Sequence, residues 1–445
     1  MTSEVLAGII TERLRDAGHA AFLVGGCVRD LLLGRHPIDF DVATSARPDE
    51  LLRLFPGADQ VGAHFGVVLV RQEEAQVEVA TFRSDLEYQD GRHPEGVHFE
   101  TDPRQDVLRR DFTINALLLD PSSGEVLDYA GGRADLEARL VRAIGDPERR
   151  FREDHLRLLR AVRFAARLQF EIEADTFAAM QRLAPAIHSV SAERVRDEIA
   201  RILTEGGARR GFELLDSTGL LREVLPEVAA LKGVQQPPEF HPEGDVWTHT
   251  LIMIEGLNRS NVPPSITLAL GVLLHDIGKP ATFRVAERIR FDGHVEKGIE
   301  IAHALLNRLR FPSHVIDGVE ALIANHMKFM EVPRMRESTL KRFMRQPDFE
   351  SHMELHRLDC MSSHGGLDNY EFIRRKQEEM PPEQLKPAPL LTGKELIAAG
   401  YRPGPMFGIV LREIEDAQLE GSISSAEEAL EMARGRLNEL LSKIA

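Results

Sequence analysis

The chain has 445 residues, of which 43% are hydrophobic and 28% are charged, and its formal net charge is -16 at pH 7. This length predicts three or four folded units rather than one. No apolar run approaches the length of a membrane span and the N-terminus lacks a basic signal region, which excludes membrane-spanning and secreted classes. With only Cys27 and Cys360 present, we expect a protein of the reducing cytoplasm without disulfides.

The first predicted elements surround a pair of glycines. Residues 21–24 form an apolar run that is typical of a buried strand, and residues 28–33 predict a short helix. Between them, Gly25 and Gly26 indicate a turn with an unusual backbone conformation or a close backbone approach. This order predicts a phosphate cradle.

The next two predicted strands carry acidic residues. In residues 38–43, Asp39 and Asp41 are two positions apart, so the period of a strand points both carboxylates to the same face. In residues 77–82, Glu78 alternates with apolar neighbours. Like charges held together usually need a cation between them, so this pattern predicts a metal site.

Gly-Gly-x-Val-Arg-Asp at 25–30 followed by Asp-x-Asp at 39–41 resembles the head of the class II tRNA nucleotidyltransferases and bacterial poly(A) polymerases, within the polymerase-β-like nucleotidyltransferase superfamily. The resemblance implies that acidic residues hold two Mg²⁺ ions and that neighbouring residues hold phosphates. The implied catalytic residues are Asp39, Asp41 and Glu78, with Asp39 and Asp41 as magnesium ligands, and the implied phosphate-binding residues are Gly25, Gly26 and Arg29. The alternative for Glu78 is a strand-edge charge that discourages aggregation.

Two further segments resemble parts of the same family. Residues 83–109 are charged and lack clean periodicity, and they resemble the flexible loop that helps CCA-adding enzymes change from CTP to ATP. Residues 109–116 match the family's second motif, in which Arg110 would pair with triphosphate oxygens, Asp111 would orient that arginine or meet the sugar, and Asn115 would hydrogen-bond locally. The alternative is that Asp111 and Asn115 only fix a turn.

From Leu136 onward the apolar period becomes 3.6, and residues 151–166 predict one helix with a continuous polar face. The nucleotide-binding candidates on this face are Glu153, Asp154, Arg157, Arg160 and Arg163. An ordinary salt-bridged solvent face is the alternative. The Glu-Asp-x-x-Arg pattern resembles the protein template of the class II family, in which Asp154 would accept from the exocyclic amine of cytosine or adenine and Arg157 would donate to the ring nitrogen. Neither guanine nor uracil offers that pairing.

Residues 233–244 are rich in Pro and Gly, which predicts a linker and a domain boundary. The histidines and aspartates beyond it follow an order that resembles the HD domain, a helical metal-dependent phosphohydrolase. The implied ligands are His249, His275, Asp276, His294, His326 and Asp359. Mixed imidazole and carboxylate ligands suit a divalent transition metal, with Mg²⁺ as the alternative. The domain either binds metal without turnover or hydrolyses phosphoesters such as 2′,3′-cyclic phosphates at damaged RNA ends.

The expected fold is α+β, with a polymerase-β-like nucleotidyltransferase head built on a small mixed sheet, followed by an all-helical neck and body, an HD domain and a tail. The expected segments are the head at 1–140, the helical neck and body with the base-selecting helix at 141–232, the HD metal-binding domain at 240–345 and the helical tail, which would contact tRNA, at 346–445.

We therefore predict template-independent addition of C, C and A to the 3′ end of tRNA, with CTP and ATP as substrates, Mg²⁺ at the catalytic site and no membrane partner. No lysine precedes Lys232, so the side-chain cations of the first half are arginines, which suit phosphate, although a GC-rich genome would also favour them. An A-adding enzyme, a CC-adding enzyme and a poly(A) polymerase remain alternatives. An alternative of another class is an HD phosphohydrolase with an inactive RNA-binding head.

Overall fold

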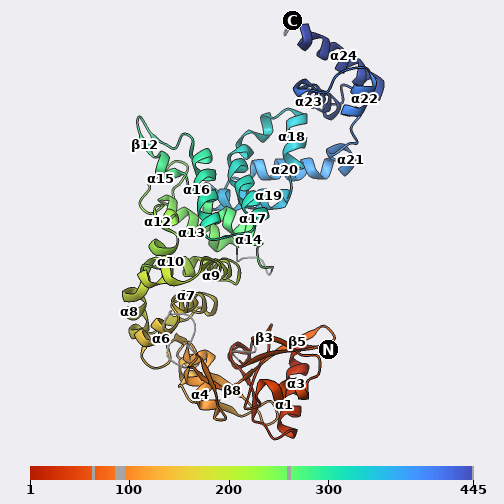
Figure 1. Ribbon diagram of the computed structural model, residues 1–445. Helices are drawn as coiled ribbons and strands as arrows, with labels where there is room; N and C mark the ends of the chain where they lie inside the picture. The colour runs from red at the N-terminus through yellow and green to blue at the C-terminus, as the bar shows by residue number, and fades with distance from the viewer. Residues whose placement is uncertain (63–65, 86–95, 258–261, 443–445) are drawn as a thin grey trace. The chain divides into compact units, whose positions relative to one another are not determined.

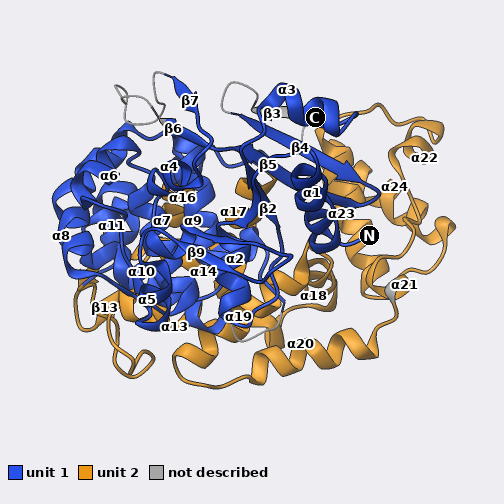
Figure 2. Cartoon of the chain, turned by 90° about the horizontal axis from the view of Figure 1, so that it is seen from below, with its two compact units in different colours: residues 1–232, 254–269, 303–313 blue, residues 233–253, 270–302, 314–445 orange. Residues whose placement is uncertain are grey.

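The computed structural model describes residues 1–62, 66–85, 96–257 and 262–442 (Figure 1). The chain forms two compact units, which Figure 2 colours separately. Unit 1 consists of Met1–Lys232, Ile254–Ala269 and His303–Ser313, and unit 2 consists of Gly233–Met253, Leu270–Ala302 and His314–Ala445. The division of the sequence into four segments stays a prediction.

A seven-stranded mixed sheet lies in the first part of unit 1 (Figure 1). Its strand order is β3-β4-β5-β2-β1-β8-β9, in which β2 and β5 pair in parallel and the other neighbours pair antiparallel. Its strands are β1 (Ala21–Val24), β2 (Asp41–Thr44), β3 (Asp59–Gly62), β4 (Val67–Gln72), β5 (Ala75–Thr81), β8 (Leu117–Leu119) and β9 (Val126–Asp128), and a separate pair joins β6 (Arg83–Asp85) to β7 (Val97–Phe99).

The register of the central strands places the acidic residues. Asp41 is the first residue of β2, and its Cα pairs with Val24 at the end of β1 and with Glu78 on β5. The strand predicted over residues 38–43 is therefore wrong at its start, and Asp39 precedes the sheet. The reason is physical: β1 ends at Val24, so residues before Asp41 have no β1 backbone to pair with.

Helices cover this sheet. In α1 (Ser3–Asp16), the Thr2 side chain caps the first turn by accepting from the Val5 N–H, and an apolar stripe that includes Ile10 packs against β1, β2 and β5. The other helices of this part are α2 (Gly26–Leu32), α3 (Pro48–Leu54), α4 (Pro103–Leu108), η2 (Thr113–Asn115) and α5 (Gly132–Glu137).

The rest of unit 1 is mainly helical. Its elements up to Lys232 are β10 (Leu140–Val141), α6 (Pro147–Glu153), α7 (Arg157–Leu168), β11 (Glu171–Ile172), α8 (Ala174–Leu183), η3 (Ala184–Ser189), α9 (Ala192–Thr204), α10 (Ala208–Ser217), α11 (Leu220–Val224) and α12 (Pro226–Ala229). The single helix predicted over 151–166 is wrong, because the chain breaks between α6 and α7, where Asp154 adopts an extended conformation with φ -151° and ψ 106°. Helices α9 and α10 pack against α7.

Unit 2 is also mainly helical. Most of its residues lie in α13 (Val246–Gly256), α14 (Ile266–Leu274), α15 (Lys279–Thr282), α16 (His294–Arg308), α17 (Ser313–Asn325), η5 (His326–Arg334), α18 (Glu337–Met344), α19 (Phe349–Ser362), α20 (Asp368–Glu379), α21 (Pro382–Leu385), α22 (Gly393–Ala398), α23 (Pro405–Leu419) and α24 (Ala426–Ser442), with one hairpin of β12 (Arg284–Val285) and β13 (Ile289–Arg290). Helices α13, α14 and α16 are divided between the two units, and Ser313 is the one residue of α17 in unit 1.

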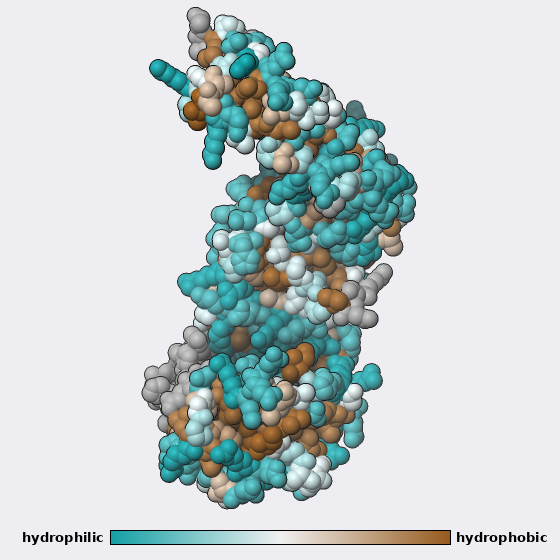
Figure 3. Space-filling view, turned by 90° about the vertical axis from the view of Figure 1, so that its right-hand side faces the viewer, coloured by the Kyte–Doolittle hydropathy of each residue, from teal (hydrophilic) through white to brown (hydrophobic). Residues whose placement is uncertain are grey.

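The fold class predicted from the sequence is confirmed: a small mixed sheet with helices is followed by a largely helical chain. The two-stranded pairs β10–β11 and β12–β13 are the departure from an all-helical body. In the part of the chain that the structure describes, no helix is long and apolar enough to cross a membrane. On the face in Figure 3, hydrophobic residues lie in separate patches among hydrophilic ones.

The contact between α7 and α10 depends on Gly207, the residue before α10. Its φ is +72°, and a Cβ there would lie 2.2 Å from the backbone oxygen of Ala166 on α7. The neighbouring Gly206 also has a positive φ, +99°, but a Cβ there would meet nothing within 4 Å. The two glycines therefore share the conformational requirement, and only Gly207 has the steric one.

We expect Gly206→Ala to lower the free energy of unfolding by about 1 kcal/mol, from the left-handed conformation alone. Gly207→Ala adds an overpacking cost and should lower it by about 2–4 kcal/mol. Urea unfolding of both variants beside wild type measures the difference. Equal losses would contradict the assigned role of the Ala166 contact.

Candidate functional site

A cavity of about 560 Å³ lies in unit 1, beside the end of β1 and the start of β2. Many of the residues predicted from the sequence to bind nucleotide or metal line it. These are Gly25, Gly26, Arg29, Asp39, Asp41, Arg110, Asp111, Asn115, Arg160 and Arg163. Four predicted residues do not line it: Glu78, Glu153, Asp154 and Arg157.

The glycine turn, an aspartate and an arginine meet at the floor of this cavity. Gly25 has a φ of +80°, and a Cβ there would lie 3.4 Å from Arg110 Nη1 and 3.8 Å from Asp41 Oδ2. Arg110 is held from the other side by Asp106, whose Oδ2 accepts from Arg110 Nη2 at 3.0 Å. The absence of a side chain at Gly25 therefore leaves room for a ligand beside the Arg110 guanidinium, a group suited to anions.

Asp41 has an unusual electrostatic environment. Burial, together with the negative charge of Glu78 on the paired strand, raises its pKa to about 6, although Arg110 opposes the shift. Glu78 and Asp39 are exposed, so they add negative charge to this edge from the solvent side. A bound divalent cation would relieve this repulsion, and carboxylate oxygens are the ligands that Mg²⁺ prefers. The residues fit a magnesium site.

A buried polar network links this floor to α7. Arg29 Nη1 donates to Asn115 Oδ1 at 2.7 Å, Asn115 Nδ2 donates to Asp111 Oδ1 at 3.2 Å, and Arg160 Nε donates to Asp111 Oδ2 at 2.8 Å. Burial alone would raise the pKa of Asp111, but Arg160 and Arg157 hold that pKa well below its usual range. The three predicted residues of the second motif therefore lie around one cavity.

Phe164 is a cavity residue that sequence analysis did not identify. The guanidinium groups of Arg29, Arg160 and Arg163 lie 5.2, 5.4 and 4.3 Å from the centroid of its ring. In the sequence, Phe164 is one of several apolar residues on the core face of an amphipathic helix, so no pattern distinguished it from those neighbours. The ring gathers three cations at the cavity wall.

The predicted base-selecting residues lie next to this cavity at the break between α6 and α7. Asp154 ends α6 in an extended conformation. Its carboxylate accepts one hydrogen bond from Nη1 of Arg194 at 3.1 Å and one from Nη2 at 2.7 Å. Arg157 Nη1 instead donates to Glu153 Oε2 at 2.8 Å. The continuous polar face predicted for these residues is therefore wrong, and two separate ion pairs replace it.

Residues 83–109 were predicted to form the loop that changes the nucleotide preference. The structure describes both ends of this segment, which contain β6, β7 and α4. Residues 86–95 of this prediction lie outside the described residues. On the described side, Asp106 of α4 is 1% exposed and accepts from both Arg109 and Arg110. An acidic residue three and four positions before two arginines is the pattern that could have identified Asp106.

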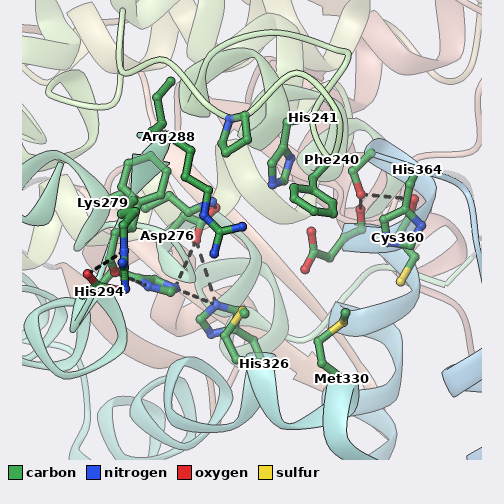
Figure 4. Close-up of a pocket in the computed structure, with 18 of the residues that line it drawn as sticks. Phe240, His241, Asp276, Lys279, Arg288, His294, His326, Met330, Cys360 and His364 are labelled. Carbon is green, nitrogen blue, oxygen red and sulfur yellow. Dashed lines mark hydrogen bonds and ion pairs between the residues drawn. The ribbon is translucent and has the colours of Figure 1, made fainter. Parts of the chain in front are cut away.

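In unit 2, the structure brings together all six residues predicted to bind metal in the HD domain; we call His249, His275, Asp276, His294, His326 and Asp359 the HD cluster. The groups His249–His275–Asp359 and Asp276–His294–His326 each have ligand atoms within 4.8 Å of one another. His275 Nε2 lies 3.1 Å from Asp276 Oδ2, which joins the two groups. Figure 4 shows Asp276, His294 and His326 facing one another at the pocket wall.

The HD cluster has the donor chemistry of a metal centre. His249 Nε2 and His275 Nε2 are buried and lie 3.2 and 3.1 Å from carboxylate oxygens, yet neither makes a hydrogen bond. Burial lowers the pKa of His326 to about 4, and burial also lowers the pKa of His294. Burial opposes protonation of His249 as well, but its contacts with Asp359 and Glu243 raise its pKa to about 9, so a metal would replace a proton on that ring. Imidazoles beside carboxylates fit a divalent metal.

Several residues beside the HD cluster were not predicted. Lys279 Nζ lies 2.6 Å from Asp276 Oδ2 and donates to Gln236 Oε1 at 2.7 Å. Glu243 Oε1 accepts from His249 Nδ1 at 2.6 Å. Gln236 and Glu243 belong to residues 233–244, which form no helix or strand, so the segment predicted as a linker also contributes buried polar contacts beside the HD cluster. Its Pro and Gly content masked the buried polar residues between them.

A pocket of about 480 Å³ opens over the HD cluster (Figure 4). Phe240, Met327 and Met330 lie on its rim and are exposed. Lys279 and Arg288 add positive charge to the lining (Figure 4). The pocket therefore offers an apolar surface and cations beside a predicted metal centre.

Comparisons with known families agree with this arrangement. The family profile for the poly A polymerase head domain matches residues 21–142, the profile for the probable RNA and SrmB-binding site of polymerase A matches residues 169–232, and the HD domain profile matches residues 246–383.

Among solved structures, the CCA-adding enzyme of Bacillus stearothermophilus in complex with CTP has 28% sequence identity and a TM-score of 0.73, and the match covers 98% of each chain. The Thermotoga maritima CCA-adding enzyme complexed with tRNA has 20% identity and a TM-score of 0.60, over 97% of this chain and 95% of that one, which shows a shared fold.

A curated relative covers nearly the whole sequence. The CCA-adding enzyme of Lactobacillus johnsonii is 31% identical over 425 residues, which are 95% of this chain and 94% of that protein. The CCA-adding enzyme of Geobacillus thermodenitrificans is 44% identical over a shorter stretch of 211 residues, which are 47% of this chain and 52% of that protein. With the glycine turn, the acidic strand and the arginine network in place, the chain belongs to the family of CCA-adding enzymes.

Proposed function

We propose that this chain adds C, C and A to the 3′ end of tRNA from CTP and ATP, and that the cavity of unit 1 is the site of transfer. The observation that carries the proposal is the meeting of Gly25, Asp41 and Arg110 within one cavity. A protein of the reducing cytoplasm is in keeping with two free, buried cysteines. The relative from B. stearothermophilus, solved with CTP, supports the nucleotide class.

In this proposal, Asp39 and Asp41 hold Mg²⁺, with Glu78 adding negative charge from the neighbouring strand. When bound, magnesium supplies charge that lowers the pKa of the RNA 3′-hydroxyl and neutralises the triphosphate and the leaving pyrophosphate. Arg110, oriented by Asp106, pairs with triphosphate oxygens, and Gly25 admits them because it has no side chain. Arg160 and Arg163 face the same cavity and add positive charge.

Base selection belongs to Asp154 and Arg157 in this proposal. A carboxylate oxygen of Asp154 accepts from the exocyclic amine of cytosine or adenine while a guanidinium N–H of Arg157 donates to the ring nitrogen. Arg194 and Glu153 orient these two side chains. No nucleic-acid template is needed, because the protein presents the complementary groups itself.

A second candidate activity is hydrolysis of a phosphoester in the HD pocket. The observation that favours it is the assembly of all six predicted ligands into two joined groups beneath a pocket with cations and apolar side chains. The HD cluster would hold a divalent transition metal, and such a metal supplies a nucleophilic hydroxide at neutral pH. Lys279 and Arg288 would attract the phosphate, and the apolar rim would contact a base. A 2′,3′-cyclic phosphate at an RNA end has this chemistry.

Product analysis on three tRNA transcripts tests the first activity. Transcripts ending at the discriminator base, at C and at CC are incubated with Mg²⁺ and with CTP, ATP or both, and products are resolved to one nucleotide. We expect two additions of C, then one of A, and then a stop. Only A on the CC-ended tRNA, only CC on the bare one, or an unbounded A ladder would assign the chain to a partial enzyme or a poly(A) polymerase instead.

Asp41→Asn should abolish nucleotide addition and stabilise the metal-free protein at high pH. Since the pKa of Asp41 in the folded protein is about 6, above its ordinary value of 3.8, ionisation of Asp41 costs the folded state free energy as the pH rises through this range. We expect a gain of about 1–3 kcal/mol at pH 8 in EDTA that disappears near pH 4. Urea unfolding at pH 4, 6 and 8 measures it.

The exposed Asp16 on α1 is the matched control, and Asp16→Asn should leave both stability and addition unchanged. A stability gain for Asp41→Asn that is the same at pH 4 and pH 8 would refute the electrostatic explanation.

The two activities should separate by mutation. Asp276→Asn keeps the side-chain shape but removes the charge shared by the two halves of the HD cluster. It should lower bound transition metal and abolish hydrolysis of 2′,3′-cyclic AMP while nucleotide addition continues. Asp39→Ala should do the reverse. If either variant lost both activities while its circular dichroism matched wild type, the assignment of one activity to each site would be wrong.

A further inference from the structure

His249 is held from both sides of its ring. Its Nε2 faces Asp359 Oδ1 at 3.2 Å, within the HD cluster, and its Nδ1 lies 2.6 Å from Glu243 Oε1. A neutral imidazole has one N–H and one lone pair. The short hydrogen bond to Glu243 holds a proton on Nδ1, so Nε2 is the ring atom that faces Asp359 and His275 and that offers its lone pair when a metal displaces its proton.

Local structure fixes Glu243 for this contact. Its side chain is 8% exposed, and its Oε1 also accepts from His241 Nδ1 at 2.9 Å. The next acidic residue, Asp245, caps the start of α13 by accepting from Thr248 N at 2.9 Å, and its Oδ2 accepts from Gly233 N at 2.6 Å. The segment before α13 is thereby tied to the helix that carries His249.

We propose that Glu243 is a positioning residue of the HD metal centre, which selects the Nδ1–H tautomer of His249 and aims Nε2 at the metal. This inference rests on the metal centre proposed above. A carboxylate that accepts the second N–H of a metal-binding histidine raises the basicity of the ligand and fixes its orientation. Glu243 lies outside residues 246–383, which the HD domain profile matches.

One experiment can distinguish this role of Glu243 from a second one, in which Glu243 binds the metal directly. His241, Glu243 and His249 also have ligand atoms within 4.8 Å of one another and would form a metal site by themselves. That site would need the Nδ1 lone pair of His249, whereas the HD cluster needs the Nε2 lone pair. A neutral ring offers only one of them, so the two arrangements compete. His241 distinguishes them, because it is a ligand in the second arrangement alone.

The test is a titration of the full-length protein with Co²⁺, followed by visible absorption, whose bands depend on the number and type of the ligands. The variants are Glu243→Ala, Glu243→Gln and His241→Ala. The matched control is Glu239→Ala, an exposed carboxylate of the same segment. Far-UV circular dichroism and the melting temperature establish that each variant is folded.

We expect Glu243→Ala to weaken Co²⁺ binding by roughly 10–100-fold, since this is the usual cost of losing such a partner. Glu243→Gln should weaken it less, because its amide oxygen still accepts from Nδ1–H, and it should shift the absorption bands only slightly. His241→Ala and Glu239→Ala should bind Co²⁺ within about threefold of wild type, a difference well below that range.

Unchanged Co²⁺ affinity in a folded Glu243→Ala variant overturns the positioning role and leaves the metal centre intact. A loss in His241→Ala as large as that in Glu243→Ala, with an altered spectrum, also overturns it and makes Glu243 a direct ligand. Failure of the wild-type protein to bind Co²⁺ overturns the metal centre itself, and the inference falls with it.

Discussion

The pairing of β2 between β1 and β5 is the constraint on which the proposed transfer site depends. It places Asp41 beside the last residue of β1 and beside Glu78. The glycine turn that ends β1 then faces Asp41, and its φ of +80° is a backbone conformation that favours glycine. Hydrogen bonding between backbones thus sets the position of a carboxylate that electrostatics disfavours. Arg110 reduces that cost, and a cation would remove it.

The HD cluster gathers its charges in another way. Its ligands come from helices and helix ends that are far apart in sequence, and Asp276 lies at the junction of two histidine groups. Neutral histidines lower the repulsion that several carboxylates would create, and Lys279 adds an opposite charge next to Asp276. The transfer site concentrates negative charge against arginines, whereas this cluster balances imidazole with carboxylate. The two compositions suit an oxygen-preferring and a nitrogen-preferring metal, respectively.

The sequence was informative wherever function requires fixed residue types at short spacing. The head motifs were recognised from patterns within a few residues, and the mixed sheet was expected from the family resemblance that those motifs carry. Asp39 was wrongly assigned to a strand. The apolar pattern around it is compatible with a strand, but it does not reveal that the partner strand β1 ends opposite Asp41. The extended Asp154 was missed because the residues on both sides have helical spacing, while the Arg194 ion pair that holds it comes from another helix. Glu243 was missed because burial of a carboxylate depends on tertiary contacts.

The broken helix bears on how a protein can replace a nucleic-acid template. A template must present its hydrogen-bonding groups rigidly, since a side chain that adapts would accept any base. The carboxylate of Asp154 uses two of its four acceptor positions in the Arg194 pair and a third for the Leu156 N–H, so one remains for the exocyclic amine in the proposed function.

Arg157 uses three of its five N–H donors in its bonds to the Arg150 carbonyl, to Glu153 and to the Arg109 carbonyl, so donors remain for a ring nitrogen. The Arg150 carbonyl belongs to α6 and the Arg109 carbonyl to the residue that ends α4, so these two contacts hold Arg157 against both helices. Glu153 and Arg157 are four residues apart, so their ion pair has the spacing of a continuous helix, whereas the Asp154–Arg194 pair joins α6 to α9. The break exchanges helix continuity for the oriented Asp154–Arg194 ion pair, and in the proposed function orientation is the property that selection between bases requires.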